Sequence, residues 1–266
     1  MILSVNGIQF SYPSRPVLQG VSFQMERGQI LAVLGVNGAG KSTILKCLNK
    51  ILRPGAGSVV LNGKDLLQMK RAEVAKHLGY VPQKYGEESL TVFDTVLLGR
   101  KPYIKWAAAE SDFQVVEKVL KRMHLEEFAM RPVNELSGGE MQKVVIARAL
   151  AQEPEILLLD EPISNLDLKN QLEVMGLIIH TVKGQGLSAV LSIHDLTLAL
   201  RFADFFLFLK NGRVHTFGDR SAVTPEVIYE VYGVQVILQE VQGFPVMITL
   251  DGVKQSRESS KEGTCL

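Results

Sequence analysis

The chain has 266 residues, enough for one large domain, or a domain with an inserted subdomain, around a sizeable core. Lysine and arginine number 29 against 28 acidic residues, and a net charge of +1 gives no global electrostatic case for a nucleic-acid partner. Two cysteines, Cys47 and Cys265, form neither a disulfide framework nor a metal-binding spacing, which fits a reducing compartment. No signal-peptide pattern opens the chain, and the longest apolar runs, such as FFLFL at 205–209, are too short to span a membrane.

Strand and turn patterns dominate the beginning of the chain. Residues 1–30 alternate in strand fashion, with turn signals at Asn6-Gly7 and Arg27-Gly28. The run ILAVLG at 30–35 is continuously apolar, as in a strand that is covered on both faces. SVVLNGKDL at 58–66 predicts a further strand and turn.

The pattern changes after residue 83. Residues 84–151 look mostly helical, with no convincing strand. Buried strands return in EILLLDEP at 155–162 and SAVLSIHD at 188–195, with helical periodicity between them. FFLFLKNGRV at 205–214 predicts a hairpin in which Asn211-Gly212 suits a type I′ turn, and VQVILQE and FPVMITL predict a small terminal sheet.

A glycine-rich segment, GVNGAGKST at 35–43, fits the phosphate-loop pattern G-x-x-x-x-G-K-[ST] between a predicted strand and a helix. Its N–H groups are expected to point at phosphate oxygens, Lys41 to reach the β- and γ-phosphates, and Ser42 to ligate Mg²⁺. The alternative is a glycine turn with an exposed lysine. The nucleotide-binding residues expected from this loop are Gly35, Asn37, Gly38, Ala39, Gly40, Lys41, Ser42 and Thr43.

The segment ILLLDE at 156–161 is predicted to be a strand followed by two acidic residues, Asp160 and Glu161. Asp160 and Glu161 then lie at the carboxyl end of a parallel strand, where open α/β sheets bind ligands. We expect Asp160 to hold Mg²⁺ through water and Glu161 to orient or deprotonate an attacking water. The alternative for this pair is a solvated acidic strand end.

The segment NELSGGEMQK at 134–143 begins with a capping box, because Ser137 precedes Glu140 by three residues. The sequence LSGGE at 136–140, shortly before LLLDEP, resembles the signature sequence of ABC-type ATPases. Other motifs similar to that family follow the same order along about residues 1–250. They are Tyr12 in FSYPSRPVLQ, Gln83 in LGYVPQ, Asp167 in SNLD and His194 in LSIHD.

The resemblance implies a role for each of these residues. Tyr12 stacks on adenine, Gln83 senses the Mg²⁺–water cluster, and His194 hydrogen-bonds the γ-phosphate and the attacking water. In the family two nucleotide domains pack head to tail, and the signature helix of one caps the γ-phosphate of ATP held by the other. The capping residues here are Ser137, Gly138 and Gly139, and Asp167 shapes the dimer seam. A second nucleotide-binding subunit, expected to be a copy of this chain, is therefore a predicted partner.

The implied fold class is α/β, a P-loop NTPase with a parallel-sheet core, an antiparallel β subdomain and an inserted helical subdomain. We expect the core and β subdomain at 1–83 and 152–220, the helical subdomain at 84–151, a small C-terminal segment at 221–250 and a disordered tail at 251–266. Departures from the family pattern are minor: Glu140, Lys143 and Ile163 stand where Gln, Arg and Thr are usual.

Two segments narrow the group within the family. LLGRKPY at 97–103 and TPEVIYEVYGVQV at 224–236 resemble ATPases that serve iron–siderophore, haem and cobalamin importers. Structurally, residues 99–102 predict a basic turn that ends a helix, and an ordinary solvated loop is the alternative. Apolar residues around Val92–Leu98 are expected to line a groove near Gln83 for the coupling helices of a permease.

The function implied is the ATP-hydrolysing, energy-coupling subunit of such an importer, peripheral on the cytoplasmic face of the membrane. Its partners are then a permease and, indirectly, a substrate-binding protein. One alternative is a soluble ABC ATPase that remodels a macromolecular complex without a permease. Another is a nucleotide-binding regulator with weak turnover, against which Glu161 and His194 both argue. The cargo, whether siderophore, haem, cobalamin or an oxyanion, stays open.

Overall fold

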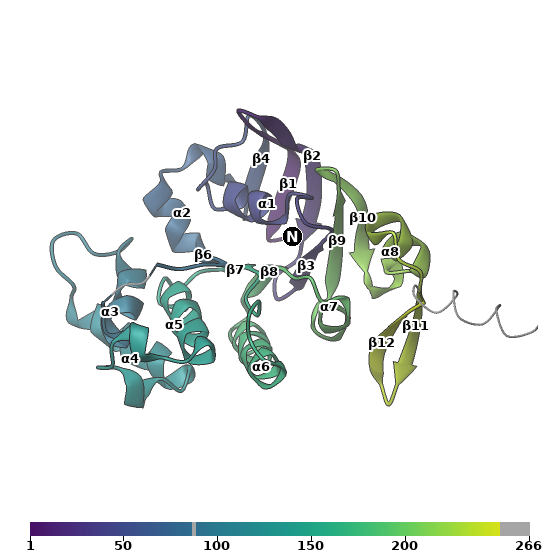
Figure 1. Ribbon diagram of the computed structural model, residues 1–266. Coiled ribbons are helices and arrows are strands. Elements are labelled where there is room, and N and C mark those ends of the chain that lie inside the picture. Colours follow the sequence, from purple (N-terminus) through teal and green to yellow (C-terminus); the bar gives the residue numbers. More distant parts are fainter. Residues whose placement is uncertain (87–88, 251–266) are drawn as a thin grey trace, which may run out of the picture.

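A six-stranded sheet organises the molecule. The computed structural model describes residues 1–86 and 89–250, so the expected tail and Cys265 lie outside the described residues (Figure 1). The strand order is β10-β9-β3-β8-β7-β6, parallel throughout except for the antiparallel pair β9–β10. The strands are β3 (Ile30–Leu34), β6 (Leu78–Val81), β7 (Ile156–Asp160), β8 (Ser188–Ser192), β9 (Phe205–Lys210) and β10 (Arg213–Asp219).

This sheet separates two hydrophobic cores, which explains its continuously apolar strands. Ile30, Ala32 and Leu34 of β3 lie in one core, together with residues of the helices on that face. Leu31 and Val33 lie in the other core, under a second sheet. Every side chain of β3 is buried, so the strand does not alternate between polar and apolar residues. This burial confirms the prediction of a strand that is covered on both faces.

The second sheet is antiparallel, with the order β2-β1-β4-β5. Its strands are β1 (Leu3–Tyr12), β2 (Arg15–Met25), β4 (Ala56–Leu61) and β5 (Lys64–Asp65). The turn predicted at Asn6-Gly7 is wrong, because β1 runs through it. The pairing of β1 with β2 shifts register between Val5 and Ile8, and Gly7 has a φ of +60°. A bulge uses the same residue types as a turn, and only the partner strand distinguishes them.

Helices cover both faces of the central sheet (Figure 1). Helix α1 (Lys41–Leu48) lies on the side of the antiparallel sheet, with Ile44, Leu45 and Leu48 fully buried. Helices α6 (Leu168–Gln185) and α7 (Leu196–Phe202) lie on the opposite side. Helix α2 (Arg71–His77) leads directly into β6.

The described residues between β6 and β7 form helices joined by turns and loops, as the mostly helical prediction implied, and the strand pairing among them is one isolated bridge between Thr91 and Pro132. The elements are α3 (Val92–Leu97), the 3₁₀ turns η2 (Leu98–Arg100), η3 (Glu126–Phe128) and η4 (Val133–Glu135), α4 (Glu110–Arg122) and α5 (Gly138–Leu150). Two residues expected to line an apolar groove around Val92–Leu98 do not do so, because Val92 and Val96 are fully buried in the core. Leu98 is 43% exposed, and Phe93 and Leu97 are partly buried, so the groove itself stays a prediction.

Arg100 is buried, so the segment LLGRKPY is not an ordinary solvated loop. Its guanidinium pairs with Asp112 at 2.9 Å and Glu153 at 2.7 Å, and donates to the Ala151 carbonyl at 2.8 Å. The Tyr103 ring covers it, with a guanidinium-to-centroid distance of 4.1 Å. The arginine thus joins the start of α4 to the end of α5, a structural task that its charge in the sequence did not indicate.

The C-terminal elements follow the hairpin β9–β10. Asn211 and Gly212 have φ angles of +51° and +75°, which confirms the turn with two left-handed residues. Helix α8 (Pro225–Tyr232) then leads to a two-stranded sheet of β11 (Val236–Val241) and β12 (Phe244–Thr249), also as predicted. Within residues 1–86 and 89–250, no helix has the length and apolar character needed to cross a membrane.

Candidate nucleotide site and signature helix

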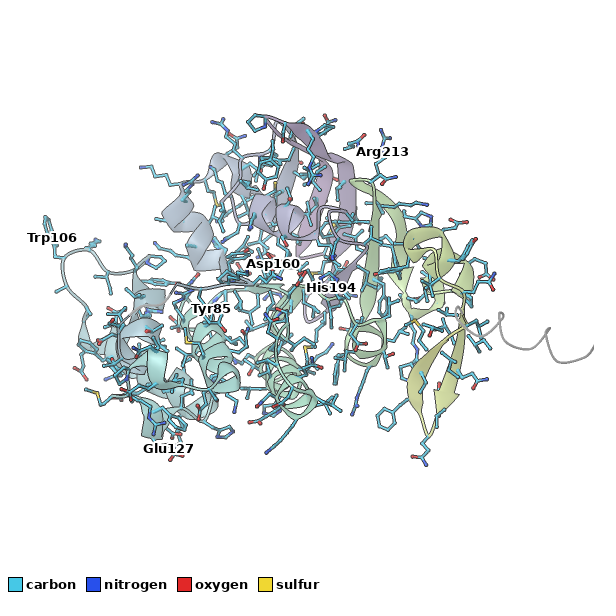
Figure 2. All side chains as sticks on the ribbon, viewed as in Figure 1. Tyr85, Trp106, Glu127, Asp160, His194 and Arg213 are labelled. Carbon is cyan, nitrogen blue, oxygen red and sulfur yellow. The ribbon has the colours of Figure 1, made fainter. Side chains whose placement is uncertain are left out.

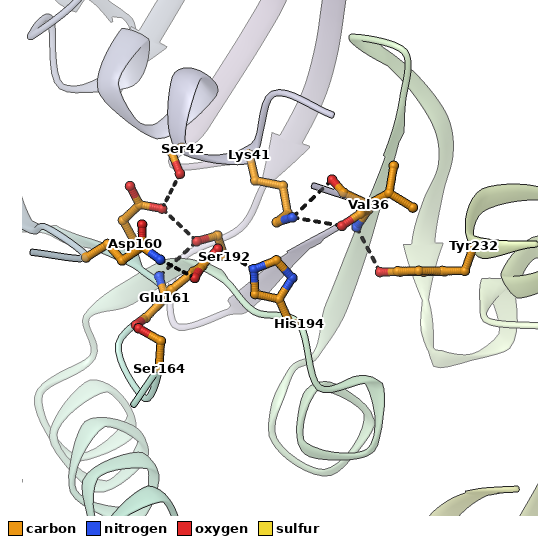
Figure 3. Close-up of polar contacts among 11 residues, drawn as sticks. Val36, Lys41, Ser42, Asp160, Glu161, Ser164, Ser192, His194 and Tyr232 are labelled. Atoms are coloured by element: carbon orange, nitrogen blue, oxygen red, sulfur yellow. Dashed lines mark hydrogen bonds and ion pairs between the residues drawn. The ribbon is translucent and has the colours of Figure 1, made fainter. Parts of the chain in front are cut away.

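The phosphate loop joins β3 to α1, as the motif requires. Gly35 leaves β3 with a φ of +144°, and a Cβ there would lie 2.4 Å from the Leu209 carbonyl oxygen. No larger residue fits this position without moving the backbone of β9. Lys41, only 5% exposed, donates from Nζ to the carbonyl oxygens of Gly35 at 2.8 Å and Val36 at 3.3 Å (Figure 3).

The environment of Lys41 contains opposing influences on its charge. Burial lowers the pKa of the ammonium, while the carboxylates of Glu161 and Asp160 act in the opposite direction. Both acids come from β7 and its end, the second predicted motif. The structure thus brings the phosphate loop and the acidic pair into one site, and the alternatives of an isolated glycine turn and a solvated strand end do not describe it.

A cavity of about 140 Å³ opens beside the phosphate loop. Tyr12 lies in its wall, 40% exposed, with Phe10 meeting its ring edge-on at a centroid distance of 4.9 Å. Arg15, from the same hairpin, also lines the cavity and was not predicted. A cavity of about 390 Å³ between α8 and β11 is larger, but no phosphate-loop residue lines it. The cavity beside the loop is lined by Tyr12, Arg15, Val17, Asn37, Gly38, Gly40, Lys41, Ser42, Thr43 and Glu161.

Three hydroxyl groups hold the carboxylate of Asp160, which is 2% exposed. Ser42 donates to Oδ1 at 2.8 Å, Ser192 donates to the same oxygen at 2.9 Å, and Tyr80 donates to Oδ2 at 3.2 Å (Figure 3 draws the two serines). Burial first, and then the charge of Asp160, raises the pKa of Tyr80 well above its usual range. The phenol therefore stays protonated and remains a donor to the carboxylate.

The oxygen atoms of Ser42 and Asp160 suit a hard cation. Hydroxyl and carboxylate oxygens are the ligands that Mg²⁺ accepts, and the two groups lie side by side at 2.8 Å. In the described part of the chain, no cluster of three or more His, Cys, Asp or Glu side chains forms a metal cage. The pair of Ser42 and Asp160 therefore fits a cation that takes its other ligands from phosphate and water, as Mg²⁺ does.

Glu161 has a left-handed backbone, with a φ of +51°, which is unfavourable for a residue with a side chain. Its N–H donates to Ser192 Oγ at 2.9 Å, and its carbonyl accepts from Ser164 Oγ at 3.0 Å. These contacts fix the peptide on both sides. The carboxylate meets two of the predicted site residues: Gln83 Nε2 at 2.5 Å, and His194 Nε2 at the other oxygen.

The structure therefore assembles the predicted hydrolytic residues from three strand ends. Gln83 follows β6, Glu161 follows β7 and His194 follows β8, and the Glu161 carboxylate contacts the other two side chains. Asp160 and His194 lie near the middle of the molecule in Figure 2. Their individual roles in hydrolysis stay predictions.

The signature segment is a separate structure. Ser137 N-caps α5, and both halves of the predicted capping box are formed: Glu140 N–H donates to Ser137 Oγ, and Ser137 N–H donates to Glu140 Oε2 at 2.8 Å. These bonds lower the pKa of Glu140 and keep it ionised. Ser137 and Gly138 are exposed, whereas Gly139 is buried. Gly139 lies so close to Asn170 that a Cβ at this position would be 2.6 Å from Asn170 Oδ1.

Asp167 N-caps α6 and ties this helix to the signature segment. It accepts from Asn170 N–H at 2.8 Å and from Asn170 Nδ2 at 3.0 Å, and Asn170 in turn abuts Gly139. Lys143, which stands where the family usually has arginine, pairs with Glu173 of α6. The signature helix and the segment after β7 therefore form one packed unit within the chain.

Sequence reasoning missed three polar residues of the nucleotide site. Ser192 lies inside a buried strand and Tyr80 inside LGYVPQ, where each reads as an ordinary core residue. The signal available for both was a polar atom in a run otherwise apolar, because buried hydroxyls require partners. Arg15 had a weaker signal, its position three residues after Tyr12 in the same hairpin.

Comparisons with known proteins agree with this arrangement. A family model described as ABC transporter matches residues 18–164. An uncharacterized ABC transporter ATP-binding protein of Methanocaldococcus jannaschii is 52% identical over 94% of this chain and 98% of its own length. The iron(3+)-hydroxamate import ATP-binding protein FhuC of Bacillus subtilis is 36% identical, covering 96% and 97% of the two chains.

A solved structure extends the similarity to three dimensions. It is described as a metal-chelate type ABC transporter in an inward-facing conformation, and it matches with a TM-score of 0.82 and 31% identity. The match covers 94% of this chain and 97% of that one. With its phosphate loop, acidic strand end and signature helix in one fold, the chain belongs to the ABC transporter family, as one of its ATP-binding, ATP-hydrolysing subunits.

Proposed function

We propose that the chain is the energy-coupling ATPase of an importer for metal chelates of the iron–siderophore, haem or cobalamin type. One observation carries the proposal: the side chains that we assign to hydrolysis meet one another beside the phosphate loop, while the start of the signature helix is exposed. The relatives that carry out chelate import, similar over nearly their whole length, support the choice of cargo class.

The nucleotide would lie in the cavity beside the phosphate loop. Tyr12 offers the exposed ring on which adenine stacks. The N–H groups of residues 35–43 face the phosphates, and Lys41 exchanges the carbonyl of Gly35 for phosphate oxygens. Because burial weakens the solvation of Lys41, its charge acts on the phosphates with little screening by water.

Glu161 is the group we assign to the attacking water. Its strained, doubly fixed backbone aims the carboxylate at the mouth of the phosphate loop, and Gln83 and His194 hold its two oxygens. We propose that His194 contacts the γ-phosphate and the water, and that Gln83 reports the state of the site to the helical segment. Ser42 and Asp160 would hold Mg²⁺, whose charge neutralises the phosphates when bound.

A second copy of the chain would complete the site. The N-terminus of α5 presents exposed N–H groups and the Ser137 hydroxyl, a suitable receptor for an anion. Among the described residues, none from α5 lines the cavity beside the phosphate loop of the same chain. We therefore propose a head-to-tail dimer in which each signature helix caps the γ-phosphate held by the partner.

The permease contact is assigned to the helical segment that begins after Gln83. This segment displays three large apolar side chains that its own core does not use: Leu98, 43% exposed, Trp106, 99% exposed, and Met130, 78% exposed. Trp106 points away from the body of the protein at the tip of a loop (Figure 2). On this proposal the chain is peripheral on the cytoplasmic face of the membrane, and a separate binding protein selects the cargo.

Co-purification tests the proposal. The tagged Glu161→Gln chain is isolated from its native host in mild detergent with ATP, and bound proteins are identified by mass spectrometry. We expect a polytopic permease, and we expect Trp106→Ala to lose it while retaining ATP binding. A soluble partner with no membrane protein enriched would instead support an ATPase that remodels a macromolecular complex. The binding protein paired with a recovered permease would then be titrated with ferric hydroxamate, haem, cobalamin and oxyanions.

A further inference from the structure

A residue from the C-terminal part of the chain contacts the phosphate loop directly. The hydroxyl of Tyr232, the last residue of α8, accepts a hydrogen bond from the N–H of Gly35 at 2.8 Å. Figure 3 shows the tyrosine entering from the side of the loop opposite to Asp160 and Glu161. The two residues are 197 positions apart in the sequence, so no local motif contains the contact.

The position of Tyr232 is fixed by contacts around α8. Ile228 and Val231 bury one face of the helix in the core, and Gly233 ends it in a left-handed conformation, with a φ of +75°. Glu230 anchors the exposed side to the central sheet. Its carbonyl accepts from Lys210 Nζ at 2.6 Å, and its carboxylate meets His215 Nε2 at 2.7 Å. The phenol is therefore presented by a docked helix rather than by a loose loop.

Gly35 has few alternatives to this hydrogen bond. The residue is buried, and the close approach of the Leu209 carbonyl fixes its backbone in an orientation that only glycine accepts. Its own carbonyl is already engaged by Lys41 Nζ at 2.8 Å. A buried N–H that loses its only acceptor costs free energy, and a loop relieves that cost by moving.

We propose that Tyr232 is a positioning residue of the nucleotide site, whose hydroxyl fixes the Gly35 amide and with it the first residues of the phosphate loop. The inference rests on the nucleotide site proposed above and adds the C-terminal segment to it. Lys41 leaves the Gly35 carbonyl when it turns to phosphate, and the Tyr232 bond then remains as the anchor of this glycine. Burial raises the pKa of Tyr232 to about 12, so the phenol stays neutral over the physiological range.

The test compares Tyr232→Phe with Tyr229→Phe. Both changes remove one hydroxyl from α8 and keep the ring, but Tyr229 is 52% exposed and lies one turn earlier. For Tyr232→Phe we expect the Kd for ATP and the KM for ATP to rise about five-fold, the usual effect of losing one hydrogen bond. We expect kcat to change less than about two-fold, because no reacting group is touched. Tyr229→Phe should match the unmodified chain in all three.

The melting temperature without nucleotide separates positioning from simple stabilisation. A lower melting temperature for Tyr232→Phe with an unchanged Kd and KM for ATP would overturn the inference. Lys41→Ala serves as the reference for the site itself. If the unmodified chain and Lys41→Ala bind ATP equally, the nucleotide site is wrongly assigned and the inference falls with it. If Lys41→Ala alone loses ATP while Tyr232→Phe binds normally, only the role of Tyr232 is wrong.

Discussion

The phosphate loop and the start of α5 are both anion sites by sequence, but the chain holds them differently. At the phosphate loop, Lys41 donates to the carbonyl oxygens of Gly35 and Val36. Asp160 accepts from three hydroxyls, which belong to Ser42 of α1, Ser192 of β8 and Tyr80 of β6. At the start of α5, the N–H and the hydroxyl of Ser137 bond with Glu140, three residues away, and Gly138 is exposed. One site is organised within the chain, and the other offers its donors outward.

The difference teaches how to assign function to similar motifs. Preorganised groups at the phosphate loop can act on charge without rearranging, which is what hydrolysis requires. Exposed N–H groups on a rigid helix end can recognise an anion only when something delivers it. The rigidity is present, because Asn170 abuts Gly139 and Lys143 pairs with Glu173. The chain thus carries two halves of a site that it does not join.

The largest expected effect comes from a substitution at the phosphate-loop site. Glu161→Gln removes the proposed base and keeps the shape, so hydrolysis should fall by a factor of about 10² to 10⁴ while ATP binding stays within about two-fold. Phosphate release and equilibrium binding are the two measurements. Glu117→Gln is the matched control, since its carboxylate is exposed on α4 and does not line the nucleotide cavity. Normal turnover in Glu161→Gln would remove Glu161 from the mechanism.

The second prediction concerns a substitution at the start of α5, the signature helix. A Cβ at Gly138 meets only Leu166 Cδ2, at an ordinary 3.6 Å, so an aspartate there fits the fold and favours the helix dipole. Its charge would repel a phosphate delivered by a partner. We expect Gly138→Asp to lose at least about ten-fold in hydrolysis and to lose ATP-dependent dimers in gel filtration, with ATP binding retained. Gly138→Ala is the neutral control, and equal losses in both variants would exclude the electrostatic explanation.

The third prediction concerns stability away from both halves. Asp112→Asn removes the charge that faces buried Arg100, which still has Glu153 and the Ala151 carbonyl. We expect a loss of about 2 kcal/mol in the free energy of unfolding, measured in urea, with ATP binding unchanged. A change in ATP affinity as large as that in stability would connect this pair to the nucleotide site.

The same pair predicts a pH dependence. The Ala109 N–H and the Arg100 guanidinium lower the pKa of Asp112 below its ordinary value. A carboxyl group with a lowered folded-state pKa contributes stability above its unfolded pKa of about 4, and loses it as the pH falls through the folded value. The unmodified chain should therefore lose stability below about pH 4 more steeply than Asp112→Asn. Parallel curves for the two chains would contradict the assignment.

The smallest expected effect comes from removing one of the hydroxyls that hold Asp160 beside the phosphate loop. Tyr80→Phe removes one of three hydroxyls from Asp160, and we expect the Mg²⁺ concentration for half-maximal hydrolysis to rise about five-fold. Tyr85→Phe is the control, because its hydroxyl donates to Gln142 Oε1 at 3.1 Å and not to Asp160. An unchanged Mg²⁺ dependence in Tyr80→Phe would mean that the two serines suffice to hold Asp160.

Local spacing carried most of what the sequence predicted. The phosphate loop, the capping box of α5 and the turn at Asn211-Gly212 each span a few residues, so their chemistry is visible in one stretch. The contacts that it did not predict join distant segments. Tyr80 meets Asp160 across 80 positions, and Tyr232 meets Gly35 across 197.

Two errors have the same origin. Asn6-Gly7 was predicted as a turn, although the pairing of β1 with both neighbours makes it a bulge. The run Val92–Leu98 was predicted to line a groove, although α4 and α5 bury Val92 and Val96. In each case the local sequence allowed both structures, a turn or a bulge and a surface or a core position. The neighbouring strand or helix determined which one formed.

Mixing two inactive variants tests the composite site most directly. Lys41→Ala disables the phosphate loop and Gly138→Asp disables the signature helix, and each alone should hydrolyse little ATP. In a mixed dimer one site pairs an intact loop with an intact signature helix, so random mixing should restore up to about a quarter of the unmodified rate. If the mixture stays as inactive as its components, hydrolysis does not use a signature helix from a partner, and the central claim is wrong.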